Sequence, residues 1–417
     1  MLRLMFLGDR IWGTSGYSKV VFTTCLKLKE LGHEIAHIPM GTSMRGGNMN
    51  YHGILIYPSG IDSFGEDVAV PHYVDFKADM LITVKDVWAF NHIFNWAINW
   101  VPLAPIDHAP VSPSITSRLH TAFKVIAISR FGQRELRHQG IDSVYIPHGI
   151  PTDVYKPLNR KAECRKLWFL EPDSFVVGIV ALNRMRKMIP HMLRGYKRFI
   201  ELNPDVKTHL MLWTVVKPTR PTAEEEEVVV PGISDIRINL LPEIVNLGLI
   251  DPKHDYVHFP EEKLVQEGIP EWLGETGGWD MVKLYSSFDV LLMCTGGEGF
   301  GLPLIEAQAV GCPVITTDYA AGPELVGAGL TVPAQDYIVA STPGTRYAIP
   351  SIDKMAEALT KIMNADPAKL AKRARRFAER YDWKIITEQY WKPFLEQCEE
   401  ELYPKISKEG ISTWARE

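Results

Sequence analysis

The stretch "TGGEGFGLPLIEAQAVGCPVITTD", from Thr295 to Asp318, places a glycine-rich turn and two glutamates between two apolar runs. The run before it, "FDVLLMC", is apolar after Asp289 and predicts a buried parallel strand. "LPLIEAQAVG" predicts a helix, with Pro303 near its start and Gly311 past its end. A glycine-rich turn between a strand and a helix is where open α/β sheets bind ligands, and free N–H groups there attract phosphate. The stretch therefore favours a diphosphate-bearing ligand.

The same alternation of short apolar runs and amphipathic stretches covers most of the 417 residues, which indicates α/β units around parallel sheets in two domains. We expect an N-terminal, acceptor-side Rossmann-like domain over residues 1–155 and a linker over 156–172. A nucleotide-sugar-binding Rossmann-like domain would follow over 173–385, and a C-terminal helical segment over 386–417 would pack back on the first domain. Strands are predicted at residues 2–8, 34–40, 80–84, 99–103, 125–128, 144–146, 174–182, 208–216, 255–259, 288–294 and 312–318.

Composition excludes several classes of protein. The net charge of −5 does not favour a general nucleic-acid binder. No apolar run approaches the roughly 20 residues of a membrane span, and "MLRLMFLGD" reaches an acid too early for a signal peptide, so a cytoplasmic location is expected. The five cysteines are scattered without CxxC spacing, which is typical of reduced thiols in or near a core.

"EGFGLPLIEAQAVGCPVITTD" resembles the Glu-x7-Glu signature of the retaining glycosyltransferases of family 4, which have the GT-B fold of two facing Rossmann-like domains. The resemblance implies that Glu298 contacts the hydroxyls of the donor sugar and that Glu306 holds the nucleotide ribose. It also implies that the backbone amides around Phe300, Gly301 and Leu302 face the sugar and the diphosphate.

Three other segments are similar to parts of that family. "VALNRMRKMIPHMLRGYKRF" resembles its basic diphosphate clamp, in which Lys187 matches the lysine and either Arg184 or Arg186 matches the arginine. "GTSGYSK", which contains Gly16, resembles the glycine-rich loop that faces donor phosphate and acceptor. In "PLAPIDHAPVSP", His108 lies where the family often has a donor-sugar histidine, although a lone histidine is more often structural.

These segments favour a retaining glycosyltransferase that moves a sugar from a nucleotide diphosphate sugar to an acceptor, with no other cofactor. The chain contains no Asp-x-Asp, so we expect catalysis without a metal. A GT-B nucleotide-sugar epimerase, a phosphorylase and a non-catalytic sugar-nucleotide or glycan-binding protein are the alternatives. The sequence leaves open the sugar, the base, the oligomeric state and the acceptor, which could be a glycan, a lipid, a small molecule, a protein or a modified nucleic-acid base.

Overall fold

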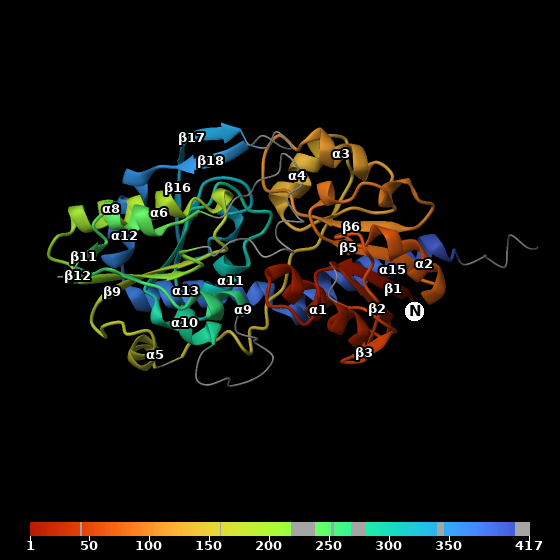
Figure 1. Ribbon diagram of the computed structural model, residues 1–417, viewed down its shortest axis with the longest axis horizontal. Coiled ribbons are helices and arrows are strands. Elements are labelled where there is room, and N and C mark those ends of the chain that lie inside the picture. The colour runs from red at the N-terminus through yellow and green to blue at the C-terminus, as the bar shows by residue number, and fades with distance from the viewer. Residues whose placement is uncertain are drawn as a thin grey trace, which may run out of the picture.

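The computed structural model describes residues 1–41, 44–158, 160–217, 238–251, 254–267, 280–339 and 346–404. These residues form two α/β domains, which lie side by side in Figure 1 with the N-terminal domain in red and orange. Each domain is built around a sheet of mainly parallel strands, and the expected GT-B arrangement is confirmed.

The first sheet has the strand order β3-β4-β2-β1-β5-β6-β7-β8, and all neighbours are parallel except the antiparallel pair β3 and β4. Its strands are β1 (Arg3–Gly8), β2 (Glu34–Pro39), β3 (Met49–Tyr51), β4 (Ile54–Ile56), β5 (Met80–Val84), β6 (Trp100–Ala104), β7 (Ile126–Ala127) and β8 (Val144–Tyr145). The helices of this domain are α1 (Gly16–Glu30), α2 (Glu66–Phe76), α3 (Pro113–Leu119) and α4 (Arg130–His138).

The second sheet has the order β13-β10-β9-β14-β15-β16, and all its neighbours are parallel. Its strands are β9 (Phe175–Val180), β10 (Thr208–Trp213), β13 (Val257–His258), β14 (Val290–Met293), β15 (Val314–Thr317) and β16 (Gly329–Val332). Two antiparallel pairs accompany it, β11 (Ile250–Asp251) with β12 (His254–Asp255) and β17 (Ala334–Val339) with β18 (Arg346–Pro350). The helices are α5 (Lys161–Leu167), α6 (Ile189–Leu202), α8 (Leu241–Asn246), α9 (Glu262–Glu267), α10 (Met281–Ser287), α11 (Leu302–Ala309) and α12 (Ile352–Met363).

Each strand predicted from the apolar runs is present, with ends shifted by a few residues. The sequence did not predict β3 and β4, which are three residues each and too short to show a period. It also did not predict β11, β16 of the second sheet, or the β17–β18 pair, in which β17 is largely exposed. Residues 217–231 contain three prolines and "EEEE", which predicts a solvated loop, and all of them but Lys217 lie outside the described residues. Within the described part of the chain, no helix is long and apolar enough to cross a membrane.

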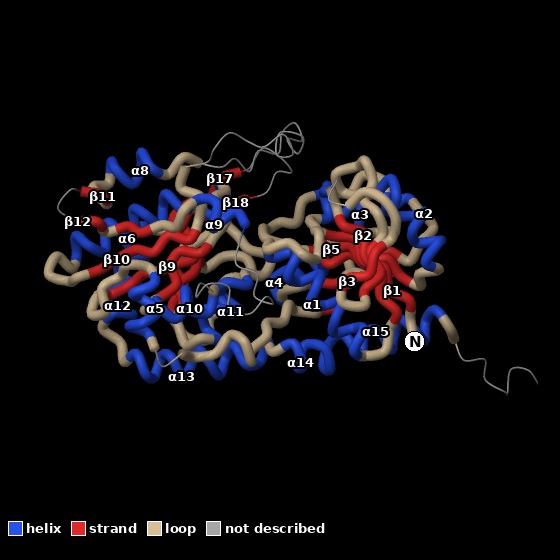
Figure 2. The backbone as a smooth tube through the Cα atoms, turned by 60° about the horizontal axis from the view of Figure 1, so that its bottom comes forward, coloured by secondary structure: helices blue, strands red, loops and turns tan. Residues whose placement is uncertain are grey.

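The C-terminal helices cross from the second domain to the first. Figure 2 shows α13 (Pro367–Ala378), α14 (Trp383–Ile386) and α15 (Lys392–Leu402) in sequence along one side of both domains. The crossing is held by apolar burial, because Trp383, Trp391 and Phe394 are at most 5% exposed. At its far end, the N-terminal ammonium pairs with Glu399, so α15 lies against the first domain as expected.

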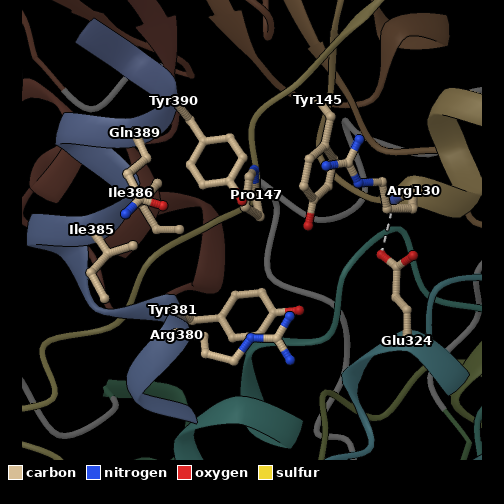
Figure 3. Close-up of a pocket in the computed structure, with 10 residues that line it drawn as sticks. All are labelled: Arg130, Tyr145, Pro147, Glu324, Arg380, Tyr381, Ile385, Ile386, Gln389 and Tyr390. Atoms are coloured by element: carbon tan, nitrogen blue, oxygen red, sulfur yellow. Dashed lines mark hydrogen bonds between the residues drawn. The ribbon is translucent and has the colours of Figure 1, made fainter. Parts of the chain in front are cut away.

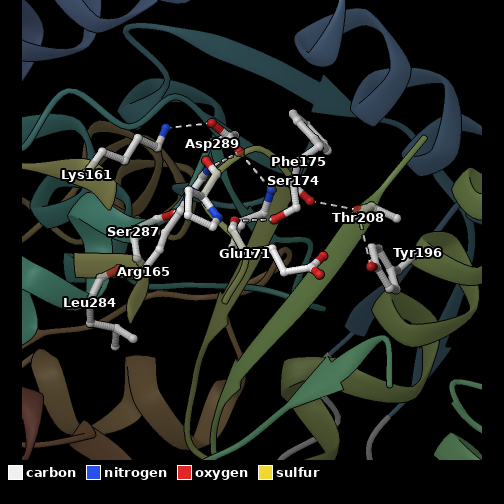
Figure 4. Close-up of polar contacts among 12 residues, drawn as sticks. Lys161, Arg165, Glu171, Ser174, Phe175, Tyr196, Thr208, Leu284, Ser287 and Asp289 are labelled. Atoms are coloured by element: carbon white, nitrogen blue, oxygen red, sulfur yellow. Dashed lines mark hydrogen bonds and ion pairs between the residues drawn. The ribbon is translucent and has the colours of Figure 1, made fainter. Parts of the chain in front are cut away.

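The amino end of β14 is fixed by a partly buried ion pair, which Figure 4 shows. The carboxylate of Asp289 binds the guanidinium of Arg165 and the ammonium of Lys161, both on α5, and accepts a hydrogen bond of 2.7 Å from the backbone N–H of Val176 on β9. Arg165 is only 4% exposed and also donates to the carbonyl of Ser287. Asp289 therefore joins α5 to the second sheet.

We predict that Asp289→Ala lowers the free energy of unfolding by about 3–5 kcal/mol, because it leaves the Arg165 charge buried without its partner. Lys161→Ala is the matched control and should cost less than about 1 kcal/mol, because the Lys161 side chain is 44% exposed. Chemical denaturation followed by circular dichroism measures both variants. Equal effects of the two substitutions would show that the ion pair with Arg165 does not stabilise this domain.

The carboxyl ends of the two sheets meet where the glycine-rich turn after β14 reaches the segment after β6. A Cβ atom on Gly297 would lie 2.2 Å from the carbonyl oxygen of Asp107, and one on Gly299 would lie 2.9 Å from the Cβ of Pro105. No real Cβ atom approaches a backbone oxygen so closely. The glycines at 297 and 299 are thus required by the contact between the two domains.

We call the arrangement in which the turn after β14 contacts the segment after β6 closed. The methyl group of Gly297→Ala should destabilise this closed arrangement by about 1–3 kcal/mol and hold the two domains apart. Small-angle scattering should show a larger radius of gyration for this variant than for the parent. Gly47→Ala is the control, since a Cβ atom there meets nothing within 4 Å. An unchanged scattering curve for Gly297→Ala would refute the closed contact.

Candidate functional site

The turn 295–301 and the start of α11 bring the two signature glutamates into one site. Gly301 precedes the helix with φ of 110°, a left-handed conformation that favours glycine. Pro303 has no backbone N–H, and the N–H of Leu304 donates to the carbonyl of Gly301 at 3.0 Å, so at this helix start it is the N–H of Leu302 that can face an anion. Glu298 in the turn is 7% exposed, and Glu306 in the helix is 5% exposed.

Glu298 contacts both basic residues of the turn that precedes α6. Its Oε1 accepts a hydrogen bond of 2.6 Å from Lys187 Nζ, and its Oε2 lies 3.5 Å from Arg186 Nη1. Arg186 Nη1 also donates to the carbonyl of Gly297 at 2.9 Å. Burial alone would raise the pKa of Glu298, but the charges of Lys187 and Arg186 hold it below its usual range. The site thus contains an ionised carboxylate with two cations fixed beside it.

The first domain adds Asp107 and His108 to this cluster. Asp107 Oδ2 lies 3.7 Å from Arg186 Nε, across the domain boundary. Asp107 Oδ1 lies 2.7 Å from His108 Nδ1, and His108 Nε2 is buried without a hydrogen-bond partner among the described residues. Burial works to raise the pKa of Asp107, yet the hydrogen bond from His108 and the charge of Arg186 lower it overall. With a proton on Nδ1 facing this carboxylate, Nε2 is free to accept a hydrogen bond from a ligand hydroxyl.

Glu306 is held by one residue from each domain. Its Oε2 accepts a hydrogen bond of 2.7 Å from the hydroxyl of Tyr285 on α10. Its Oε1 lies 3.6 Å from Lys19 Nζ on α1 of the first domain. In the sequence, Lys19 is only the last residue of the glycine-rich "GTSGYSK", and Tyr285 lies in no motif. No sequence pattern pairs Tyr285 with Glu306, because the contact depends on how α10 packs against α11.

The other candidates surround this cluster. Gly16 begins α1 opposite Leu302, whose Cδ1 would lie 3.6 Å from a Cβ atom at position 16. The ring of Phe300 packs against that of His148, with centroids 5.0 Å apart, and is 4% exposed, so only the backbone of Phe300 is available to a ligand. Arg184 begins the turn that carries Arg186 and is partly exposed.

Two further polar pairs lie at neighbouring strand ends of the first sheet, after β1 and β5. Lys85 Nζ donates to Asp9 Oδ1 at 2.9 Å, and the Tyr17 hydroxyl donates to Asp86 Oδ2 at 3.2 Å. Burial, with the nearby charge of Asp107, raises the pKa of Asp86. These pairs were not predicted from the sequence. The carboxyl ends of neighbouring parallel strands meet at one edge of a sheet, and this rule could have identified them.

A second-domain tyrosine holds the residue that follows His108. The hydroxyl of Tyr319 accepts a hydrogen bond of 3.0 Å from the N–H of Ala109 and donates one of 2.9 Å to the carbonyl of Arg346 on β18. The N–H of Ala348 on the same strand donates to the carbonyl of Gly296 at 2.8 Å. The β17–β18 pair, which the sequence did not predict, therefore supports both sides of the site. In the described ranges, no group of three or more His, Cys, Asp or Glu side chains could hold a metal ion.

Residues 257–365 match the model of the family described as Glycosyl transferases group 1. The chain is 22% identical over 245 residues to a D-inositol 3-phosphate glycosyltransferase of Saccharomonospora viridis, covering 58% of this chain and 47% of that protein. It is 26% identical over 225 residues to the lipopolysaccharide core biosynthesis mannosyltransferase LpsB of Rhizobium meliloti, covering 52% and 54% of the two chains. The chain thus spans about half the length of these curated relatives.

Solved structures match over nearly the whole chain. A sucrose-phosphate synthase from Thermosynechococcus elongatus superposes with a TM-score of 0.72 at 17% identity, covering 95% of this chain and 99% of that one. The Anabaena protein HepE, solved in complex with UDP-glucose, superposes with a TM-score of 0.65 at 16% identity, covering 95% and 100%. The chain therefore has the GT-B fold, and its second domain carries a segment that matches the group 1 glycosyl transferases.

Proposed function

We propose that this chain is a retaining glycosyltransferase that moves a sugar from a nucleotide diphosphate sugar to an acceptor hydroxyl and needs no metal. One observation carries the proposal. Two buried glutamates lie before and within the start of α11, and Lys187 and Arg186 contact the first of them. Arg186 also lies beside Asp107 of the first domain, which in turn contacts His108. Glu306 can accept hydrogen bonds from a ribose, the two cations can bind a diphosphate, and Glu298 with His108 can contact sugar hydroxyls. These three groups occur in the same order in a nucleotide diphosphate sugar.

The donor is proposed to lie on the second domain. Glu306, oriented by Tyr285, accepts hydrogen bonds from the ribose diol, as the family resemblance implies. Lys187, Arg186 and the amides around Gly301 and Leu302 bind the diphosphate, with Arg184 close by. Glu298 and His108 contact the sugar hydroxyls.

The charge of the site suits the reaction. When the bond between the anomeric carbon and the diphosphate oxygen breaks, negative charge grows on the leaving group, and the two fixed cations with the helix amino end stabilise it. The acceptor oxygen forms the new bond on the face that the leaving group departs from, and its proton passes to the leaving phosphate oxygen. The acceptor would enter over the first domain, beside Asp86 and Tyr17.

Lys187→Ala should lower turnover by about 10²–10³, because it removes a preorganised cation from the leaving diphosphate. Lys187→Arg should recover only part of this loss, since a planar guanidinium does not occupy the place of a compact ammonium. Single-turnover kinetics with a saturating donor separate this effect from weaker binding. Parental activity in Lys187→Ala would exclude the proposed clamp.

Glu306→Ala should weaken the binding of free nucleoside diphosphate by about 1.5–3 kcal/mol, since charged hydrogen bonds to the ribose are lost. Tyr285→Phe should weaken it less, because the phenol only orients the carboxylate. Glu298→Ala should leave nucleotide affinity nearly unchanged and reduce transfer. Isothermal titration calorimetry measures all three variants, and equal losses at positions 298 and 306 would contradict this division of roles.

The function as a whole is tested with a panel of nucleotide diphosphate sugars. At least one should raise the melting temperature, and with a suitable acceptor it should give a product whose anomeric proton shows retained configuration by NMR, in excess EDTA as well. Conversion of the donor sugar without any acceptor would identify an epimerase instead. Stabilisation by none of the panel, or an inverted product, would overturn the proposal.

A further inference from the structure

A pocket of about 510 Å³ lies between the two domains, next to both segments that connect them. Figure 3 shows its lining. Arg130 and Tyr145 come from the first domain and Glu324 from the second. Pro147 lies on the first connecting segment, and Arg380 with Tyr381 lies on the second, where Ile150 and Asp382 form a parallel bridge. A ligand in this pocket would therefore touch both domains and both connections.

Two guanidinium groups line the pocket without a carboxylate partner. Arg130 Cζ lies 3.8 Å from the centre of the Tyr145 ring, and Arg380 Cζ lies 5.3 Å from that of Phe377. Among the described residues, neither side chain has a carboxylate oxygen within 4 Å. Stacking on a ring holds a guanidinium by its face and leaves its N–H edge directed at the surroundings. Arg130 Nη1 donates to Gln133 Oε1 at 3.1 Å, and the rest of its edge and that of Arg380 can meet a planar or tetrahedral oxyanion.

Among the described residues that line the pocket, the acid Glu324 already has hydrogen-bond partners. The carboxylate of Glu324 accepts hydrogen bonds from the backbone N–H groups of Arg130 at 3.0 Å and Phe131 at 3.2 Å. It thus caps the amino end of α4, a helix of the other domain. Because this cap joins the two domains, the wall of the pocket is complete only when the domains are closed.

Uncharged donors complete the lining. In Figure 3, the hydroxyls of Tyr145 and Tyr381 point toward each other across the pocket. The two guanidinium groups and two phenols supply more hydrogen-bond donors than a ligand carboxylate could accept. A phosphate monoester has three terminal oxygens to accept these hydrogen bonds, and its double charge matches the two guanidinium charges. The volume exceeds that of a phosphate, and Pro147 and Ile386 give the remainder of a molecule apolar contact.

We propose that this interdomain pocket binds the phosphate group of a small phosphorylated molecule and that the closed arrangement of the domains is needed for this binding. The site is distinct from the proposed donor site. The ring of Tyr381 packs against that of Phe300, with centroids 5.9 Å apart, so these two rings lie between the pocket and the glycine-rich turn. The inference goes beyond the proposed function and does not rest on it.

Titration of the full chain with inorganic phosphate, at constant ionic strength set with potassium chloride, tests the site. Arg380→Gln should lower phosphate affinity ~10-fold or more, because charged hydrogen bonds are lost, and Arg380→Lys should give an intermediate affinity. Arg376→Gln is the matched control, since Arg376 is exposed on α13 outside the pocket and the change in net charge is the same. It should bind phosphate as the parent does.

Two further variants identify where phosphate binds and whether closure matters. Lys187→Gln, in the proposed diphosphate clamp, should keep the Arg380-dependent binding. Gly297→Ala should weaken phosphate binding, although Gly297 does not line the pocket, because it holds the domains apart. Loss of binding in Lys187→Gln but not in Arg380→Gln, or no saturable binding at all, would overturn the site. Parental affinity in Gly297→Ala would overturn its dependence on closure.

Discussion

The candidate site depends on a tight contact between the domains, in which the Gly297 backbone packs against the carbonyl of Asp107 and leaves no room for a Cβ atom. This approach brings the turn that carries Glu298 onto the segment that carries His108. It also places Asp107 within 3.7 Å of Arg186, so the basic turn before α6 faces carboxylates from both domains. A Cβ atom at position 297 would clash with the carbonyl of Asp107 and so move Glu298 and Arg186 away from Asp107 and His108.

Electrostatic compensation explains how so many charges coexist in this contact. Burial works to raise the pKa of both carboxylates, but Lys187 and Arg186 lower the pKa of Glu298 overall. The hydrogen bond from His108 and the charge of Arg186 do the same for Asp107, so one guanidinium acts on both acids. The arrangement holds the cations in place before any ligand arrives, which lowers the reorganisation that binding a diphosphate requires. Because Arg186 lies beside Asp107 of the first domain and also belongs to the proposed diphosphate clamp, ligand binding and domain closure are coupled through Arg186.

The glycines of the turn illustrate what the sequence analysis interpreted incompletely. From the sequence, the turn was predicted to bind a diphosphate-bearing ligand, whereas the space beside Gly297 and Gly299 is filled by Asp107 and Pro105 of the other domain. Gly301 is the position where the left-handed conformation before α11 accounts for the glycine. The composition of a turn shows that something approaches closely, but not what approaches.

The sequence by itself determined the fold class, most strands and the helix α11, because apolar periodicity and glycine or proline at helix ends are local signals. It also singled out Glu298, Glu306, Lys187 and His108 through local motifs. Only the tertiary structure decided that Tyr285 and Lys19 meet Glu306 and that Tyr319 holds the residue after His108. These contacts join residues from separate helices, loops and domains, and no local pattern of residue types encodes a distance between segments far apart in the chain.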